Sequence, residues 1–285
     1  MKIATFGARF FGGQISRIEE GFIELGHEIN FECPDLIFSN DPGFYEEAYK
    51  LKEKNSKAKL ILNVLDIPFH LKEANAVINE IKPKLQKADV ITSISKATSL
   101  SIKKYIGLNS YIIYNPVKDV SFLNLRKEKF FMAVGRLADP NKRFALAVNS
   151  ISFFNKEIDI FGSDSLAITG SIIKGHGIVS DEKLNYNYNI TKFYLATSYN
   201  EGLCLPMIES LICGCIPITC LDMTTASEFI PEEFLTEPNQ EKIAQKINSI
   251  NQDYNNYQKI ALSFGKKYSK TFNKITIAQN ILNLL

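Results

Sequence analysis

Residues 130–142, with the sequence FFMAVGRLADPNK, join a short apolar run to a glycine and a charged loop. The apolar run 130–134 is typical of a buried strand, and Gly135 marks its end. A helix is predicted over 142–154, so the stretch has the strand–loop–helix order of an α/β unit. Strands that alternate with helices favour a parallel sheet covered on both faces.

The same alternation extends in both directions from this stretch. Upstream, strands are predicted at 2–6, 28–32, 35–39, 59–64, 89–92 and 110–114, and helices at 14–25, 43–54, 71–87 and 95–106. Downstream, strands are predicted at 157–161, 172–178, 192–197 and 215–219, and helices at 205–214, 238–250, 253–269 and 272–285. The polar stretch 118–129 separates the two series and predicts a linker. Two α/β series indicate two doubly wound, Rossmann-like domains, which bind ligands beyond the carboxyl ends of their strands and so face one cleft.

Bulk composition narrows the function. The chain has 285 residues, 45% of them hydrophobic, and a formal net charge of +2, which suits two globular domains and gives no nucleic-acid footprint. No export signal is evident, so a cytoplasmic protein with reduced thiols is expected. The apolar window 203–221 contains Glu209 and two prolines, which favours a buried helix followed by a strand over a membrane span.

Four of the five cysteines gather at Cys204, Cys213, Cys215 and Cys220. Their spacing does not match a zinc site, and the histidines lie elsewhere in the sequence. We therefore expect buried, apolar thiols and no metal site.

The first candidate site is the loop Gly135-Arg136-Leu137-Ala138-Asp139-Pro140-Asn141-Lys142. Arginine offers a planar fork for bidentate phosphate binding, and lysine offers a compact point charge. Two cations in a strand-to-helix loop form a plausible diphosphate clamp. The alternative interpretation is a solvated turn with ordinary surface charges.

The second candidate site is EGLCLPMIE, residues 201–209, which follows the predicted strand 192–197. Pro206 suits the first turn of a helix, whose free N–H groups could bind phosphate. A helix would set Glu201 and Glu209 ~12 Å apart, farther than the ~5–9.5 Å between the carboxylates of a glycosidase. The two carboxylates therefore indicate separate binding groups for sugar or ribose hydroxyls, with helix capping as the alternative.

The motifs together resemble the large family of retaining nucleotide-sugar glycosyltransferases with the GT-B fold, group 1 or family 4-like. The family pattern G-R-x5-K is matched by Gly135, Arg136 and Lys142, and the pattern E-G-F-G-L-P-x-x-E by residues 201–209. ESLICGCIPITC, residues 209–220, resembles the segment that follows in the family, and Asn115-Pro116-Val117 resembles the element at the domain junction.

The resemblance implies roles for individual residues. Arg136 and Lys142 would hold the donor diphosphate, Glu201 the donor sugar and Glu209 the ribose hydroxyls. The catalytic set implied is Arg136, Lys142 and Glu201, and the donor-binding set is Gly12, Gly13, Gly202, Leu203, Cys204, Leu205 and Glu209. The implied domains are an acceptor-side domain over 1–117, a nucleotide-sugar domain over 118–268, and helix 269–285 packing back on the first domain.

The implied reaction is transfer of a hexose, with retention and without a metal, from a UDP- or GDP-sugar to a hydroxyl acceptor. The donor is a substrate, so no cofactor is expected, and the acceptor could be a glycan, a lipid or a small molecule. Lysines on the first domain leave a peripheral membrane contact open. The alternatives are a non-catalytic sugar-nucleotide or glycan-binding protein, and a sugar-nucleotide 2-epimerase using His70, His176 or Asp66.

Three features depart from the family pattern. Leu65 stands before Asp66 where the family often has histidine, and His70 could substitute for it. Cys204 replaces the usual glycine, which would crowd the donor sugar or reshape its loop. The first domain, about 117 residues, is short for the family, so the acceptor is not indicated by analogy.

Overall fold

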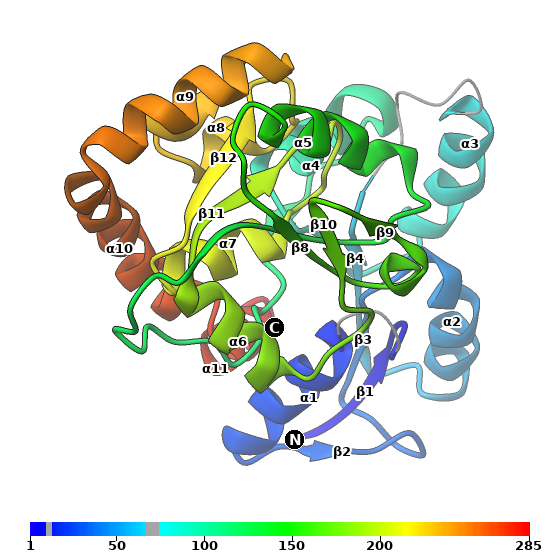
Figure 1. Cartoon of the computed structure of the whole chain (residues 1–285). Helices are drawn as coiled ribbons and strands as arrows, with labels where there is room; N and C mark the ends of the chain where they lie inside the picture. Colours follow the sequence, from blue (N-terminus) through cyan, green and yellow to red (C-terminus); the bar gives the residue numbers. More distant parts are fainter. Residues whose placement is uncertain (10–12, 67–73) are drawn as a thin grey trace. The chain divides into compact units, whose positions relative to one another are not determined.

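The computed structural model describes residues 1–9, 13–66 and 74–285. The chain divides into two compact units (Figure 1). Unit 1 comprises Met1–Pro116 and Thr271–Leu285, and unit 2 comprises Val117–Lys270.

Unit 1 is built on a six-stranded sheet with the order β2-β1-β3-β4-β5-β6, and all of its pairings are parallel. The strands are β1 (Lys2–Phe6), β2 (Glu28–Ile29), β3 (Leu36–Ser39), β4 (Lys59–Val64), β5 (Val90–Ser93) and β6 (Tyr111–Ile112). The helices are α1 (Gln14–Glu24), η1 (Pro42–Phe44), α2 (Tyr45–Lys54), α3 (Ala74–Leu85), α4 (Lys96–Ser101), η2 (Ile102–Ile106) and α11 (Lys274–Leu282).

The strands of unit 1 bury both faces of the sheet because alternate side chains point to opposite sides. Ile3, Leu36, Phe38 and Ile61 pack with buried residues of α1 and α11. Their neighbours in the strands, among them Ala4, Ile37, Leu60 and Leu62, pack with α2, α3 and η2. Helices therefore cover both faces, as the doubly wound prediction requires.

The last helix of the chain packs closely on the first. Gly21 in α1 lies so near α11 that a Cβ added there would be 2.4 Å from the carbonyl oxygen of Lys274. The Lys274 ammonium lies 2.8 Å from Glu20 and 2.9 Å from Glu24, and Phe272 stacks on Tyr114 at 4.8 Å between ring centroids. Only a residue without a side chain permits this approach of two helix backbones.

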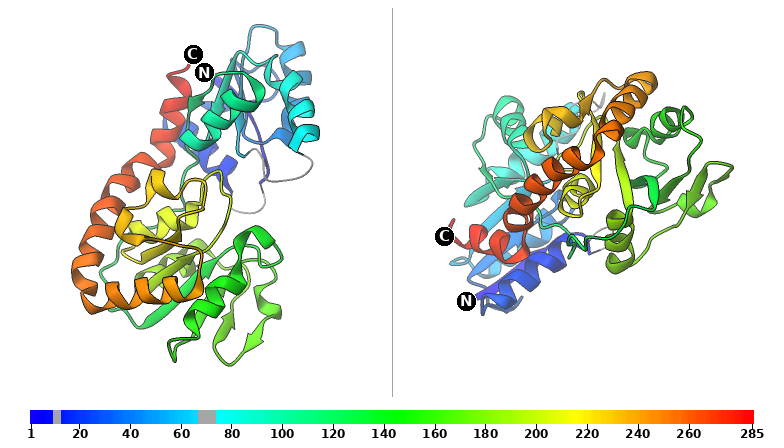
Figure 2. Two further views of the ribbon diagram at one scale, coloured as in Figure 1. Left: turned by 90° about the horizontal axis from the view of Figure 1, so that it is seen from above. Right: turned by 60° about the vertical axis from the view of Figure 1, so that its left-hand side comes forward.

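Unit 2 contains a seven-stranded sheet with the order β13-β12-β11-β7-β8-β10-β9, in which only the β9–β10 pairing is antiparallel among the described residues. The strands are β7 (Lys129–Val134), β8 (Ile158–Phe161), β9 (Thr169–Gly170), β10 (Ile173–Gly175), β11 (Thr191–Ala196), β12 (Ile216–Cys220) and β13 (Leu235–Thr236). The helices are η3 (Pro140–Lys142), α5 (Phe144–Ile151), η4 (Ser165–Ala167), α6 (Asp181–Ile190), α7 (Leu205–Ile212), α8 (Ala226–Phe229), η5 (Glu232–Phe234), α9 (Gln240–Gln252) and α10 (Tyr254–Thr271). Figure 2 shows α9, α10 and α11 following one another in orange to red.

The structure confirms the prediction of two Rossmann-like α/β folds and corrects some of its elements. The helix predicted from residue 142 begins at Phe144, because Pro140–Lys142 form a 3-10 turn and Arg143 is left-handed. The helix α6 was not predicted, since its sequence DEKLNYNYNI lacks a clear apolar stripe. The short elements β9, β13 and α8 were also missed.

The apolar window 203–221 forms α7 followed by β12, as predicted, and Cys204, Cys213, Cys215 and Cys220 are all buried free thiols. In the part of the chain that the structure describes, no helix has the length and apolar character needed to cross a bilayer.

Candidate donor-binding site of unit 2

The loops at the carboxyl ends of β7 and β8 lie in direct backbone contact. The Gly135 N–H donates to the Phe161 carbonyl at 2.9 Å, and the Leu137 N–H to that of Ser163 at 3.4 Å. Gly162 has a φ of 131°, and a Cβ there would be 2.0 Å from the Gly135 carbonyl oxygen. A glycine is therefore required for the loop that carries Arg136 to pass so close to its neighbour.

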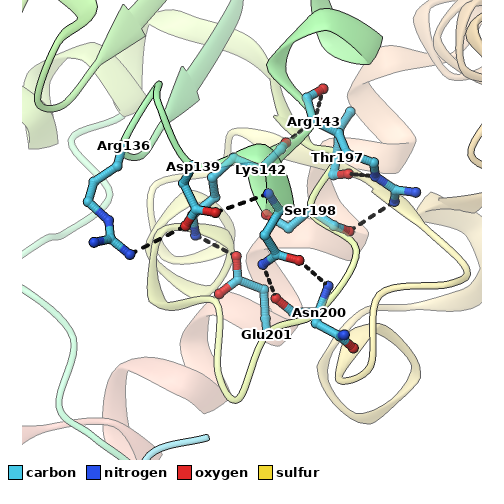
Figure 3. A network of polar contacts seen from close by, with 9 residues as sticks. Arg136, Asp139, Lys142, Arg143, Thr197, Ser198, Asn200 and Glu201 are labelled. Carbon is cyan, nitrogen blue, oxygen red and sulfur yellow. Dashed lines mark hydrogen bonds and ion pairs between the residues drawn. The ribbon is translucent and has the colours of Figure 1, made fainter. Parts of the chain in front are cut away.

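Lys142 and Glu201 form an ion pair, with Lys142 Nζ donating to Glu201 Oε1 (Figure 3). The exposed fractions of the two side chains are 19% and 13%, so the pair is largely shielded from solvent. Burial lowers the pKa of Lys142, but the neighbouring Glu201 carboxylate, helped by Cys204 and Asp139, raises the pKa above its ordinary value. Lys142 is therefore a stable cation, and the structure brings together two of the three predicted catalytic residues.

Arg136 lies apart from this pair and is much more accessible. Its side chain is 63% exposed, and Nη2 lies 3.4 Å from Asp139 Oδ2 (Figure 3). Arg136 lines a cavity of about 420 Å³ together with Ala138, Asp139 and Asp164. A mobile guanidinium at the rim of a cavity can turn toward an anion.

Two residues that the sequence analysis missed, Asn141 and Arg143, connect the Lys142 loop to the segment after β11. The Tyr199 N–H donates to the Asn141 carbonyl at 2.9 Å, and the Asn200 N–H to Asn141 Oδ1 at 2.8 Å. Arg143 Nε and Nη2 donate to the carbonyl oxygens of Thr197 and Ser198 (Figure 3). No local sequence signal indicates these contacts, since the partners lie more than fifty residues apart.

The segment that follows Glu201 approaches the start of α7. Gly202 and Cys204 are buried, Leu203 is half-buried, and Leu205 is the first residue of the helix. Burial raises the pKa of the Cys204 thiol to about 12, with the Glu201 carboxylate adding to the effect. Cys204 is therefore a neutral thiol beside the ion pair.

Glu209 lies one helical turn farther into α7 and is 2% exposed. Its Oε1 accepts from the Lys118 N–H at 3.2 Å, and its Oε2 lies 3.2 Å from the Tyr188 hydroxyl, which donates to it. The carboxylate thus has protein partners on both oxygens. Its predicted role in binding ribose remains a prediction.

The predicted residues of unit 1 are separate. Gly13 lies just before α1 with a φ of 60°, a left-handed conformation that favours glycine, and Gly12 lies outside the described residues. Asp66 is exposed after β4, and His70 also lies outside the described residues. His176 in unit 2 bonds Asp159 through Nε2 and stacks on Phe161 at 4.6 Å, so the structure gives it a packing role.

Solved structures with the same architecture extend over the whole chain. HepE of Anabaena, whose crystal structure contains UDP and glucose, matches with 16% identity and a TM-score of 0.77 over 100% of this chain and 99% of that one. Sucrose-phosphate synthase of Thermosynechococcus elongatus matches with 16% identity and a TM-score of 0.79 over 100% and 98%. TarM of S. aureus matches with 20% identity and a TM-score of 0.67 over 95% and 58%. The chain has the two-domain fold of these proteins, the GT-B fold.

Sequence comparison narrows the class. Residues 172–265 match the model of the family described as Glycosyl transferases group 1. Over 98 residues, 34% of this chain, the sequence is 32% identical to O-antigen chain mannosyltransferase B of Escherichia coli. The match spans a quarter of that relative's length. Within the GT-B class, the chain therefore resembles the group 1 glycosyltransferases.

Proposed function

We propose that this protein is a retaining glycosyltransferase that moves a hexose from a UDP- or GDP-sugar to a hydroxyl acceptor without a metal ion. The observation that carries the proposal is the shielded Lys142–Glu201 pair, held where the loops after β7 and β11 meet. Doubly wound sheets bind ligands at this edge. In this proposal unit 2 is the donor domain and unit 1 the acceptor domain.

The two members of the pair suit the two halves of the donor. The Lys142 ammonium has three N–H donors, of which Glu201 uses one, so it can bind a phosphate oxygen without leaving the carboxylate. Glu201 has a second oxygen, which can accept from a sugar hydroxyl. The pair would thereby fix the bond between sugar and phosphate beside Lys142.

Arg136 supplies the second cation of the proposed clamp. Its exposed guanidinium can turn from Asp139, 3.4 Å away, to a bidentate contact with the diphosphate. The charge on the departing phosphate grows as the sugar leaves, so two fixed cations lower the barrier more than they improve binding. The amides of 202–204, which precede α7, would add dipoles of the same sign.

Apolar surface for the nucleobase lies in the neighbouring loops. Leu166 and Ile178 are 72% and 77% exposed, which is unusual for side chains of this kind. The Gly162 N–H donates to the Gly177 carbonyl at 2.8 Å, so both side chains belong to the loops that adjoin Gly135. A planar base could cover them beside the diphosphate.

The proposed chemistry needs no protein nucleophile. The acceptor oxygen attacks the anomeric carbon on the face from which the diphosphate departs, forming one C–O bond as the other breaks. The leaving phosphate oxygen takes the acceptor proton. The relatives reported above are transferases and a synthase, so the comparisons do not favour an epimerase or a non-catalytic binding protein.

The test begins with a thermal-shift screen against UDP- and GDP-sugars, in which a specific donor raises the melting temperature by mass action. Single-turnover hydrolysis or transfer with that donor then compares Arg136→Ala, Arg136→Lys and Lys142→Ala with the control Arg126→Ala, which alters an exposed arginine. We expect losses of ~10²–10³ in rate for the three site variants and none for the control. Turnover within a few-fold of the parent in all three folded variants would remove the proposed clamp.

Retention is tested separately. The anomeric configuration of the first product formed, followed by NMR, should equal that of the donor. An inverted product would disprove the same-face mechanism while leaving the transferase activity intact.

A further inference from the structure

Arg143, the residue after Lys142, has a backbone conformation that arginine rarely adopts. Its φ and ψ are 49° and 43°, the left-handed region, and it precedes the first residue of α5. In this region the Cβ of any residue except glycine is crowded by the backbone. The conformation therefore has a cost in free energy that contacts of the side chain must offset.

The Arg143 guanidinium makes four hydrogen bonds to two other loops. Nε donates to the Thr197 carbonyl at 2.6 Å, and Nη2 to the Ser198 carbonyl at 3.0 Å. Nη1 and Nη2 each donate to one oxygen of Asp222 at 2.7 Å, the bidentate geometry that arginine forms with carboxylates. One side chain therefore connects the loops that follow β7, β11 and β12.

These contacts bear on the Lys142–Glu201 pair because they surround it in sequence. Thr197 Oγ1 donates to the Lys142 carbonyl at 2.9 Å, and Asn141 on the other side of Lys142 binds the N–H groups of Tyr199 and Asn200. The segment 197–200 leads directly to Glu201. The backbones of the two ion-pair partners are thus held together from both sides.

We propose that Arg143 and Asp222 form a latch that positions Lys142 and Glu201 for a nucleoside diphosphate, without contact to the ligand. Four of the five N–H groups of Arg143 already have protein acceptors, so the residue is occupied by the loops rather than open to a ligand. This inference rests on the proposed function: it adds a positioning residue to the donor site.

The chemistry of the latch explains the choice of arginine. Glycine would adopt the left-handed backbone without strain but would connect nothing. Lysine could reach a single acceptor and would lose the fork that spans a carboxylate and two carbonyls. The hydrogen bond with Asp222 is the largest cause that raises the pKa of Arg143, while burial alone would lower it.

The variants that test the latch separate strain from contact. Arg143→Gly relieves the backbone and removes the fork, Arg143→Lys keeps the charge, and Asp222→Asn keeps the shape of the acceptor. Arg126→Lys is the matched control, an exposed arginine in the same unit. The double variant Arg143→Gly with Asp222→Asn tests whether the two residues act as one unit.

Two measurements are made on each variant. The first is amide hydrogen exchange of Tyr199 and Asn200, whose N–H groups bind Asn141. The second is calorimetric binding of UDP and of GDP, followed by kcat and KM with the donor found by thermal shift. We expect exchange at least tenfold faster in the three single latch variants. We expect nucleoside diphosphate binding and kcat about tenfold lower, with the double variant no worse than Arg143→Gly.

The outcomes distinguish the latch from the proposed function. Unchanged exchange in folded Asp222→Asn and Arg143→Lys would overturn the latch, and these two decide the matter if Arg143→Gly does not fold. Faster exchange with diphosphate binding within twofold of the parent would show a merely structural contact and overturn the positioning role. Faster exchange in a protein whose parent form binds neither UDP nor GDP would contradict the proposed function and leave the latch standing as a connection between loops.

Discussion

Replacing Glu201 with glutamine should destabilise the protein through Lys142. The substitution preserves shape and removes the only carboxylate that the described residues place on the Lys142 ammonium. Breaking a buried pair while one charge remains costs about 3–5 kcal/mol. Because the side chains are still 19% and 13% exposed, we expect the low end, about 3 kcal/mol. That corresponds to a fall in melting temperature of about 6–12 °C for a domain of ~150–250 residues.

The pH dependence of the loss identifies its cause. In the parent the pKa of Lys142 is raised above its ordinary value, so the pair's contribution is complete below the unfolded pKa of ~10.4 and is lost as the pH rises through the folded pKa. In Glu201→Gln, burial would instead lower the pKa of Lys142, and the strained cation would deprotonate sooner. The stability gap should therefore be constant near pH 7–8 and narrow as the pH approaches ~10.

Calorimetric unfolding of four proteins would check this reasoning: the parent, Glu201→Gln, Lys142→Met and the double variant. The double variant should recover much of the loss because it leaves no unpaired charge. Glu157→Gln is the control, since it breaks the exposed pair with Lys174, whose side chains are 57% and 52% exposed. Additive effects of the two substitutions, or a loss no greater than in the control, would refute a coupled, shielded ion pair.

Three further predictions concern the rest of the site. Transfer should be unchanged in excess EDTA, because arginine and lysine meet the diphosphate charge in the proposed clamp; activity abolished by EDTA and restored by magnesium or manganese would argue against that clamp. Glu209→Gln should raise the KM for the donor about tenfold with kcat little changed, as expected for a group remote from the breaking bond; steady-state kinetics beside the control Tyr188→Phe, which removes only a protein partner of that carboxylate, would show whether ribose binding is lost. Gly162→Ala should lower the free energy of unfolding by about 2–4 kcal/mol, because the added Cβ would be 2.0 Å from the Gly135 carbonyl oxygen; urea unfolding at full stability would contradict that packing.

Much of the fold could be predicted because the signals are local. The apolar run 130–134 and the glycine after it place β7 and its loop to within one residue of the structure. The same holds for β4 and α7, where the apolar pattern and Pro206 set the start of each element. The helix α6 escaped because its buried residues are largely asparagine and tyrosine, which do not produce an apolar stripe.

The connections within the site could not be predicted because their partners are distant in sequence. Arg143 and Asp222 are separated by 79 residues, and nothing near either indicates the other. The left-handed backbone of Arg143 contradicts local preference and exists only because three loops converge on its side chain. Local reasoning therefore identified Lys142 as a candidate and placed it inside a helix, whereas the structure places it in a turn before one.

The pairing of Lys142 with Glu201 addresses a difficulty of any diphosphate clamp in a shielded site. A cation shielded from water is unstable until its anion arrives, and in the proposed function the donor is absent for part of each cycle. Glu201 stabilises the ammonium during that interval, and Arg143 and Asn141 fix the segment that carries it. When a donor binds, the ammonium needs no large movement, since its remaining N–H groups can meet a phosphate. The reorganisation that would raise the barrier has then already taken place during folding.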